Sequence, residues 1–231
     1  MKITKYIKKE LSNWNIFEII SLIAVLFIIF FNAYLNNDSL IAVASASCGI
    51  LYTVFAGKGK ISCYFFGIIG SIFYIYLAFK NYLLGNLFLN LGYYLPMQII
   101  GIFHWKSNLR ADTYEIKKTH LQNKERIFVM SFIIIGIIIL DIVLSTLGGK
   151  NHILDSLTTI FSIAGMYLTV KRCIEQWFLW FAVNLLEIII WTKVLYAGEK
   201  VYATIIMWTF YLVLSIYFYL CWYKELKSAC K

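Results

Sequence analysis

The stretch Ile127–Leu147, IFVMSFIIIGIIILDIVLSTL, decides the fold class because it is long and holds a single charged side chain, Asp141. The hydrocarbon core of a bilayer is about 30 Å thick, and an α-helix needs about 20 apolar residues to cross it. The rest of the chain has a matching composition, since 61% of its residues are hydrophobic and 14% are charged. A soluble domain has about 45–50% apolar and about 25% charged residues. The sequence therefore excludes a water-soluble fold and predicts an all-α integral membrane protein.

Seven further apolar stretches of similar length lie on either side of this one. None shows the alternating pattern of a transmembrane barrel strand, and the first is too long for a secretory signal, so we predict eight transmembrane helices. The predicted spans are Ile19–Leu35, Ser39–Gly57, Ile61–Phe79, Tyr82–Trp105, Ile127–Leu147, Ile153–Val170, Gln176–Ala197 and Val201–Tyr223.

The lysines and arginines predict the orientation of the chain. Eight spans put both termini on one side, and that side receives all but four of the 21 basic residues. Short cytoplasmic loops carry an excess of Lys and Arg, so we expect both termini in the cytoplasm and the chain in the cytoplasmic (inner) membrane. Basic loops next to anionic lipid also account for the net charge of +9, and no nucleic-acid partner is expected.

The sequence contains a weak internal repeat. Shifting it by 117 positions (155 − 38) aligns Asp38-Ser39-Leu40 with Asp155-Ser156-Leu157 and, without a gap, pairs Trp105 with Trp222. We interpret the match as two parallel three-helix repeats joined by a linker helix, with a substrate path between the halves. The predicted segments are 1–37 (N-terminal segment and peripheral helix), 38–105 (first repeat), 106–150 (cytoplasmic loop and linker helix) and 151–231 (second repeat and tail).

Large polar side chains in mid-membrane are the candidate binding residues, because each one needs a partner or a function there. Tyr94 and Gln98 are four residues apart in the fourth span, and Trp180 and Asn184 have the same spacing in the seventh. A spacing of four places each pair on one helical face. We expect Gln98, Asn184 and Thr159 to lie at similar depth, where they would suit a small heteroaromatic ligand that carries hydroxyl groups.

Other polar and aromatic residues of the spans have structural explanations of comparable weight. Ser45, Thr158 and Ser162 are as well explained as hydrogen bonds between helices. Trp177 and Trp191 lie near the two ends of the seventh span, and we expect them in the interfacial belt of aromatic residues.

Four residues are candidates for a gate or hinge. Pro96 removes the backbone hydrogen bond to Gly92 and should kink its helix. Asp38 and Asp155 begin outer helix ends, where each serves equally well as a gate residue or as an N-cap. Glu187, like Asp141, could be protonated, paired with a cation or used to attract a cationic substrate, and the sequence does not choose among these roles.

The sequence lacks the motifs of enzymes and of metal or cofactor sites. The three histidines lie at span ends or in a loop, and there is no H-E-x-x-H, P-loop or G-x-S-x-G pattern. The five cysteines form no C-x-x-C pair. We therefore expect no catalytic residues, metal or cofactor. An intramembrane enzyme, a channel or a scaffold is the remaining alternative to a carrier.

Two segments carry a family resemblance that covers nearly the whole chain. YLPMQ at 94–98, followed by Gly101 and Trp105, and EQWFLWFAVN at 175–184 resemble the PnuC vitamin transporters. The most specific element is W-x-x-x-N, here Trp180 to Asn184, which the resemblance assigns to a nicotinamide riboside site. The family has three-plus-one-plus-three helices, similar to the SWEET sugar transporters, and the extra first span departs from that core.

The resemblance implies facilitated diffusion of nicotinamide riboside for NAD biosynthesis, with phosphorylation by a cytosolic kinase trapping the product. A pyridinium ring could stack on Trp180, with Asn184 and Gln98 bonding the ribose or carboxamide. Tyr94, Thr159 and Tyr211 are further candidates for the same lining. Thiamine and riboflavin, carried by relatives within the family, stay open as alternative substrates, and so does association of the chain with further copies of itself.

Overall fold

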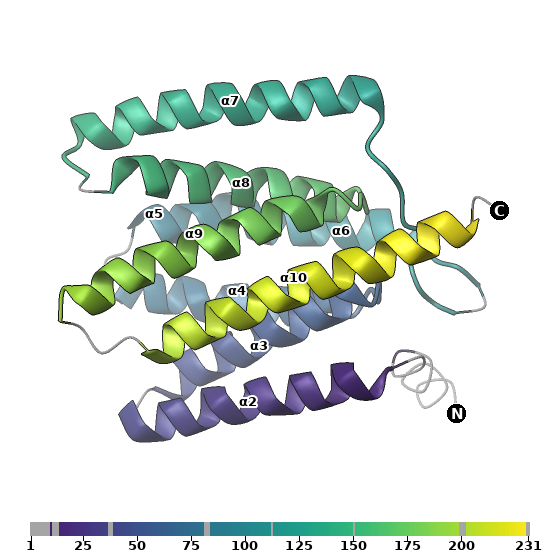
Figure 1. Cartoon of the computed structure of the whole chain (residues 1–231), viewed down its shortest axis with the longest axis horizontal. Coiled ribbons are helices and arrows are strands. Elements are labelled where there is room, and N and C mark those ends of the chain that lie inside the picture. The colour runs from purple at the N-terminus through teal and green to yellow at the C-terminus, as the bar shows by residue number, and fades with distance from the viewer. Residues whose placement is uncertain are drawn as a thin grey trace. The chain divides into compact units, whose positions relative to one another are not determined.

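The computed structural model describes residues 10, 14–36, 39–80, 84–111, 113–149, 151–198 and 202–229. This part of the chain is helical and has no β-strand beyond two isolated bridges that involve the loop after residue 106. The helices (Figure 1) are α2 (Ile16–Asn36), α3 (Leu40–Gly57), α4 (Cys63–Lys80), α5 (Leu84–Leu89), the π-helical turn η1 (Asn90–Tyr94), α6 (Leu95–Lys106), α7 (Asn123–Thr146), α8 (His152–Val170), α9 (Gln176–Tyr196) and α10 (Tyr202–Ala229).

Seven of the described helices are long and apolar enough to cross a membrane. Their surfaces agree with a lipid environment, because large apolar side chains such as Phe30, Ile138 and Leu220 are 58%, 55% and 49% exposed. Exposed apolar surface of this extent is stable only when lipid or protein covers it. The predicted fold class, an all-helical integral membrane protein, is confirmed in this coarser form.

The remaining predicted span is helical from 84 to 106 but is divided by the π-turn η1. The N–H of Leu95 bonds to the carbonyl of Asn90, five residues back. Pro96 follows directly and has no N–H to donate. A widened turn at this point accommodates the proline without a full break of the helix. The sequence predicted a kink here and did not anticipate the π-turn.

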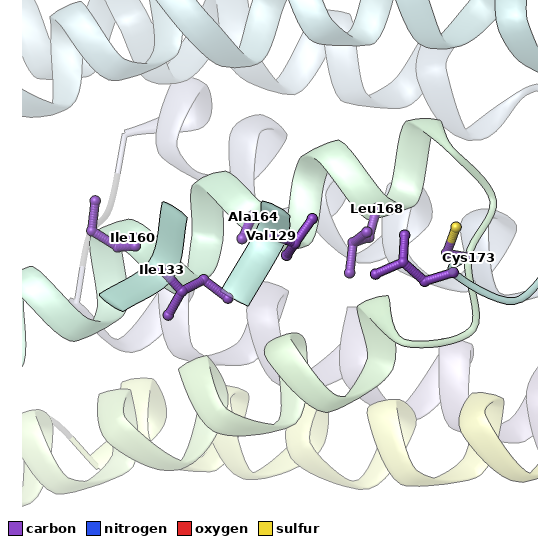
Figure 2. Close-up of a cluster of buried hydrophobic side chains, with 7 residues drawn as sticks. Val129, Ile133, Ile160, Ala164, Leu168 and Cys173 are labelled. Atoms are coloured by element: carbon purple, nitrogen blue, oxygen red, sulfur yellow. The ribbon is translucent and has the colours of Figure 1, made fainter. Parts of the chain in front are cut away.

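The described chain divides into two compact units, 1–117 and 118–231. In the first unit α4 packs against both α3 and α6, and in the second α9 packs against both α8 and α10. The helix α7 belongs to the second unit and packs on α8. Figure 2 shows part of this contact, where Val129 and Ile133 of α7 meet Ile160, Ala164 and Leu168 of α8 in one buried cluster.

The ends of the helices give a different register from the internal match that the sequence suggests. Helix α3 ends at Gly57 and α8 at Val170, whereas α4 begins at Cys63 and α9 at Gln176. Both comparisons give an offset of 113 (170 − 57 and 176 − 63). The gapless offset of 117 that the sequence suggested is therefore wrong for α3 against α8 and for α4 against α9.

Helices α6 and α10 agree with the offset of 117 (222 − 105), as a recurring aromatic contact shows. Trp105 and Trp222 are both 0% exposed. Trp105 meets Tyr64 edge-on with ring centroids 4.9 Å apart, and Trp222 meets Trp177 edge-on at 5.6 Å. Tyr64 and Trp177 are the second residues of α4 and α9. Trp177 is thus a core residue with 4% exposure, and its predicted place in an interfacial belt is wrong.

The loop after α6 is fastened to an equivalent turn in each unit, and we call residues 113–119 the strap. Gly59 and Arg172 both have left-handed backbone, with φ of 68° and 62°. The carbonyl of Gly59 accepts a hydrogen bond from the N–H of Ile116 at 3.0 Å, and the carbonyl of Arg172 accepts one from Thr119 at 3.0 Å. The strap is therefore an ordered part of the fold.

Two side chains in the second turn, 171–175, have shifted pKa values. A hydrogen bond with the Glu125 carboxylate raises the pKa of Lys171 above its ordinary value. Burial raises the pKa of the Cys173 thiol, which lies 3.7 Å from the Thr119 hydroxyl of the strap. Both shifts favour the protonated side chain.

Candidate functional site

Trp180 is the centre of a cluster between α8 and α9, which we call the Trp180 cluster (Gly165, Thr169, Trp180 and Asn184). The indole N–H of Trp180 donates to the Thr169 hydroxyl at 3.1 Å, and that hydroxyl donates to the Gly165 carbonyl at 2.9 Å. A Cβ atom on Gly165 would lie 3.2 Å from the Trp180 ring. The ring is therefore fixed by a hydrogen bond at its edge and by close contact with the backbone of α8.

Asn184 lies one helical turn after Trp180 and is 5% exposed. No hydrogen bond between described residues involves its carboxamide, whereas the indole N–H of Trp180 is already used by Thr169. Buried amides are normally hydrogen-bonded. Because the Asn184 carboxamide has no such bond among the described residues, its donor and acceptor groups are unused. Trp180 thus offers mainly a ring, and Asn184 offers polar atoms.

Gln98 is the centre of a second cluster, the Gln98 cluster (Tyr52, Gly67, Ser71 and Gln98), which lies in the first unit. Its Nε2 donates to the Ser71 hydroxyl at 3.0 Å. A Cβ on Gly67 would lie 3.2 Å from Cδ of Gln98 and 2.8 Å from the Tyr52 ring. Gly67 therefore allows side chains from α3 and α6 to approach α4 together.

The two clusters contain the same aromatic contact with the helix roles exchanged. At the offset of 113, Tyr52 corresponds to Gly165 and Gly67 corresponds to Trp180. In the first unit the ring comes from α3 and the glycine from α4, whereas in the second unit the ring comes from α9 and the glycine from α8. The sequence prediction missed Gly67 and Gly165, although a glycine in an apolar span is itself a signal of close helix approach.

The other predicted binding residues have different surroundings. Tyr94 lies in η1 and meets the Tyr93 ring at 5.6 Å, and Tyr211 in α10 meets the Trp208 ring at 5.7 Å. Thr159 in α8 is partly exposed.

Among the predicted gate residues, Asp38 lies outside the described residues. The side chain of Ser39, not Asp38, caps α3 by accepting from the Ala42 N–H at 3.2 Å. Asp155 is exposed in the first turn of α8 and is not its N-cap, which is Asn151. Glu187 accepts a hydrogen bond from the Trp191 indole at 3.2 Å.

Asp141, which the sequence left without a partner, pairs with a histidine. Its Oδ1 lies 2.6 Å from Nδ1 of His152, so a polar contact joins α7 to the start of α8. The described residues hold no group of three or more His, Cys, Asp or Glu side chains that could bind a metal ion. Asp141 and His152 thus interact as a pair of side chains.

Comparison with known proteins identifies the family. A family model described as nicotinamide mononucleotide transporter matches residues 39–224. The chain belongs to the PnuC family. Relatives named nicotinamide riboside transporter PnuC are 35% identical in Neisseria mucosa (95% of this chain, 86% of the relative) and 36% identical in Haemophilus influenzae (98% and 99%). A crystal structure of the vitamin B3 transporter PnuC is 34% identical, with a TM-score of 0.80 over 96% of this chain and 97% of that one.

Membership of the PnuC family makes this chain a multi-pass membrane transporter and not an enzyme. The matched region begins at Ser39, the N-cap of α3, so α2 lies outside the family model. The alignments with both PnuC relatives cover at least 95% of the chain, and they therefore include at least part of α2.

Proposed function

We propose that this chain carries nicotinamide riboside across the cytoplasmic membrane by facilitated diffusion, with alternating access and phosphorylation by a cytosolic kinase that traps the product. The observation that carries the proposal is the Trp180 cluster, which offers a fixed indole ring one turn from an amide with unused hydrogen-bonding capacity. The names of the two relatives support this choice of substrate.

The proposed roles follow from the chemistry of the substrate. A pyridinium ring is a flat cation, and stacking on Trp180 would contribute about 0.5–2 kcal/mol of cation–π attraction. Asn184 and Gln98 would hydrogen-bond the ribose hydroxyls or the carboxamide, with Tyr94, Thr159 and Tyr211 as further lining. Pro96, Asp155, Glu187 and Asp38 are proposed for the gate or hinge. We place both termini in the cytoplasm, because that side holds most of the basic residues.

We further propose the 3+1+3 arrangement, with α7 as the linker between two parallel three-helix repeats. Its support is the recurrence of one turn geometry and one aromatic contact in both units. A reporter that is active only in the cytoplasm, fused after residue 231, tests the orientation. An inactive reporter on an expressed and folded fusion would contradict it.

A binding titration of the purified protein tests the substrate. Nicotinamide riboside should bind, and Trp180→Ala and Asn184→Ala should each weaken binding at least about tenfold. Trp14→Ala is the matched control, because Trp14 lies outside the family-matched region, and it should leave the affinity unchanged. Tighter binding of thiamine or riboflavin would favour the alternative substrates of the family.

Uptake into vesicles tests the mechanism. Saturable uptake should be insensitive to the loss of proton and sodium gradients, and it should stop at equal concentrations on both sides when no kinase is present. Accumulation above the external concentration without a kinase would refute facilitated diffusion, and uptake that never saturates would favour a channel.

A further inference from the structure

The Gln98 carboxamide uses only one of its two ends. The side chain is 6% exposed, and its Nε2 donates to the Ser71 hydroxyl. Its Oε1 is buried and has no hydrogen-bond partner among the described residues. A buried acceptor without a partner is unfavourable, and it is commonly explained by a bound ligand, a water molecule or a functional requirement. The free oxygen therefore points to a donor that the protein itself does not supply.

Ser71 holds the nitrogen end of the carboxamide. Its hydroxyl accepts one of the two Nε2 hydrogens, and Oε1 is left without a partner among the described residues. Ser71 is itself 7% exposed and lies one turn after Gly67, where α3, α4 and α6 approach each other closely. The side chain of Gln98 is thus held in one orientation by packing and by one hydrogen bond.

The second unit also has a carboxamide and a hydroxyl at these positions, but each lies on the helix where the first unit has the other. Ser71 corresponds to Asn184 at the offset of 113, and Gln98 corresponds to Ser215 at the offset of 117. Each repeat therefore has one buried carboxamide and one buried hydroxyl at equivalent positions. The hydroxyl of Ser215, however, donates to the Leu212 carbonyl of its own helix at 2.7 Å. Among the described residues, the hydrogen bond between carboxamide and serine thus occurs in the first repeat and not in the second.

We propose that Ser71 is a positioning residue that orients Gln98 so that Oε1 accepts a hydrogen bond from the substrate, and that this contact selects ligands carrying an O–H or N–H donor. The inference rests on the proposed function and assigns a direction to one of its hydrogen bonds. The donor is either a ribose hydroxyl or the carboxamide N–H of the nucleoside, and these share the chemistry that Oε1 recognises.

The test compares affinities of the purified protein for nicotinamide riboside. Ser71→Ala should weaken binding about tenfold, the size expected for the loss of one well-oriented hydrogen bond. Ser71→Thr, which keeps the hydroxyl, should restore most of the affinity. Ser215→Ala is the matched control and should bind like the wild type. Adding Ser71→Ala to Gln98→Leu should have no further effect, because the amide it positions is gone.

Two analogues identify the donor. Nicotinic acid riboside lacks the carboxamide N–H, and deoxyribose analogues lack one ribose hydroxyl. The wild-type protein should bind the analogue that lacks the donor for Gln98 more weakly than it binds nicotinamide riboside. In Ser71→Ala and in Gln98→Leu, this difference between the two ligands should vanish.

Three results would overturn the inference. The first is a Ser71→Ala variant that binds nicotinamide riboside as tightly as the wild type. The second is a loss of affinity from Ser71→Ala that is equally large when Gln98→Leu is also present. The third is a Gln98→Leu variant that still binds the analogue more weakly than nicotinamide riboside. Each of these leaves the proposed function standing if the wild type binds nicotinamide riboside. Absence of wild-type binding would instead reject the proposed function itself.

Discussion

Replacing Lys60 by Met should strongly destabilise the first unit. The Lys60 side chain is 0% exposed, its Nζ donates to the Thr113 carbonyl at 3.0 Å, and it lies 3.3 Å from Oε1 of Glu115. Methionine has a similar length but no charge, so the variant leaves the Glu115 carboxylate, whose side chain is 13% exposed, without the lysine charge beside it. Removal of one partner from a buried ion pair costs about 3–5 kcal/mol.

This loss can be measured by thermal unfolding in detergent. For a chain of this size, about 3–5 kcal/mol corresponds to a decrease in Tm of about 6–20 °C. Lys106→Met is the matched control, because Lys106 is an exposed lysine at the end of α6, and its Tm should match the wild type. The double variant Lys60→Met with Glu115→Gln should recover part of the loss, since it removes both charges of the pair. A Tm of Lys60→Met equal to that of the wild type would refute this account of the strap.

Three further predictions concern other contacts. Gly101→Ala should lower the free energy of unfolding by about 1–3 kcal/mol, because the new Cβ would lie 2.3 Å from the Tyr64 ring; an unchanged Tm would contradict this. In a variant that keeps only Cys173, alkylation should have a pH midpoint above that of a free thiol, since burial raises its pKa; an ordinary midpoint would contradict it. Asp141→Asn should cost about 0.5–1 kcal/mol through its contact with His152, measured by thermal unfolding, whereas an unaffected Tm would argue against that contact.

The effect of pH on stability through the Cys173 thiol follows from the direction of its pKa shift. A folded-state pKa above the unfolded value means that the folded protein binds the thiol proton more tightly. The contribution to stability is therefore complete below the ordinary thiol pKa and is lost as the pH rises through the folded value. Alkylation and unfolding should thus change over the same alkaline range.

The positions of the membrane helices could be predicted from the sequence because length and charge set them. A continuous apolar run such as 127–147 has few structural alternatives in a chain of this composition, and α7 covers nearly the same residues. The π-turn before Pro96 could not be predicted, because it depends on which carbonyl the Leu95 N–H reaches. A proline alone indicates a disturbed helix and does not specify how the helix adapts.

The register of the internal match shows how scattered identities can mislead. Tyr94, Ile99 and Trp105 match at an offset of 117 where the helices agree with it, whereas Asp38-Ser39-Leu40 matches at 117 although α3 and α8 end 113 residues apart. The connection between the second and third helices changes the offset by four positions (117 − 113), and apolar helices of similar composition hide such a change. The turn geometry at Gly59 and Arg172 reveals it only in the structure.

The candidate residues were predictable by type but not by partner. Trp180, Asn184 and Gln98 stood out because large polar groups are rare in a span. The partners of Trp180 and Gln98, Thr169 and Ser71, are small residues that occur often in membrane helices for packing alone. Only the packing of helices against each other shows which small hydroxyl contacts which candidate residue.

The strap has a practical consequence for anyone who adds tags or fluorescent reporters to this transporter. A long polar connection normally invites such insertions, but here Ile116 and Thr119 each hold a structured turn through the main chain. An inserted epitope would pull those amides away from Gly59 and Arg172. An insertion after α7 would meet the same difficulty, because the amides of Gly148 and Gly149 bond to the carbonyls of Ser145 and Leu144.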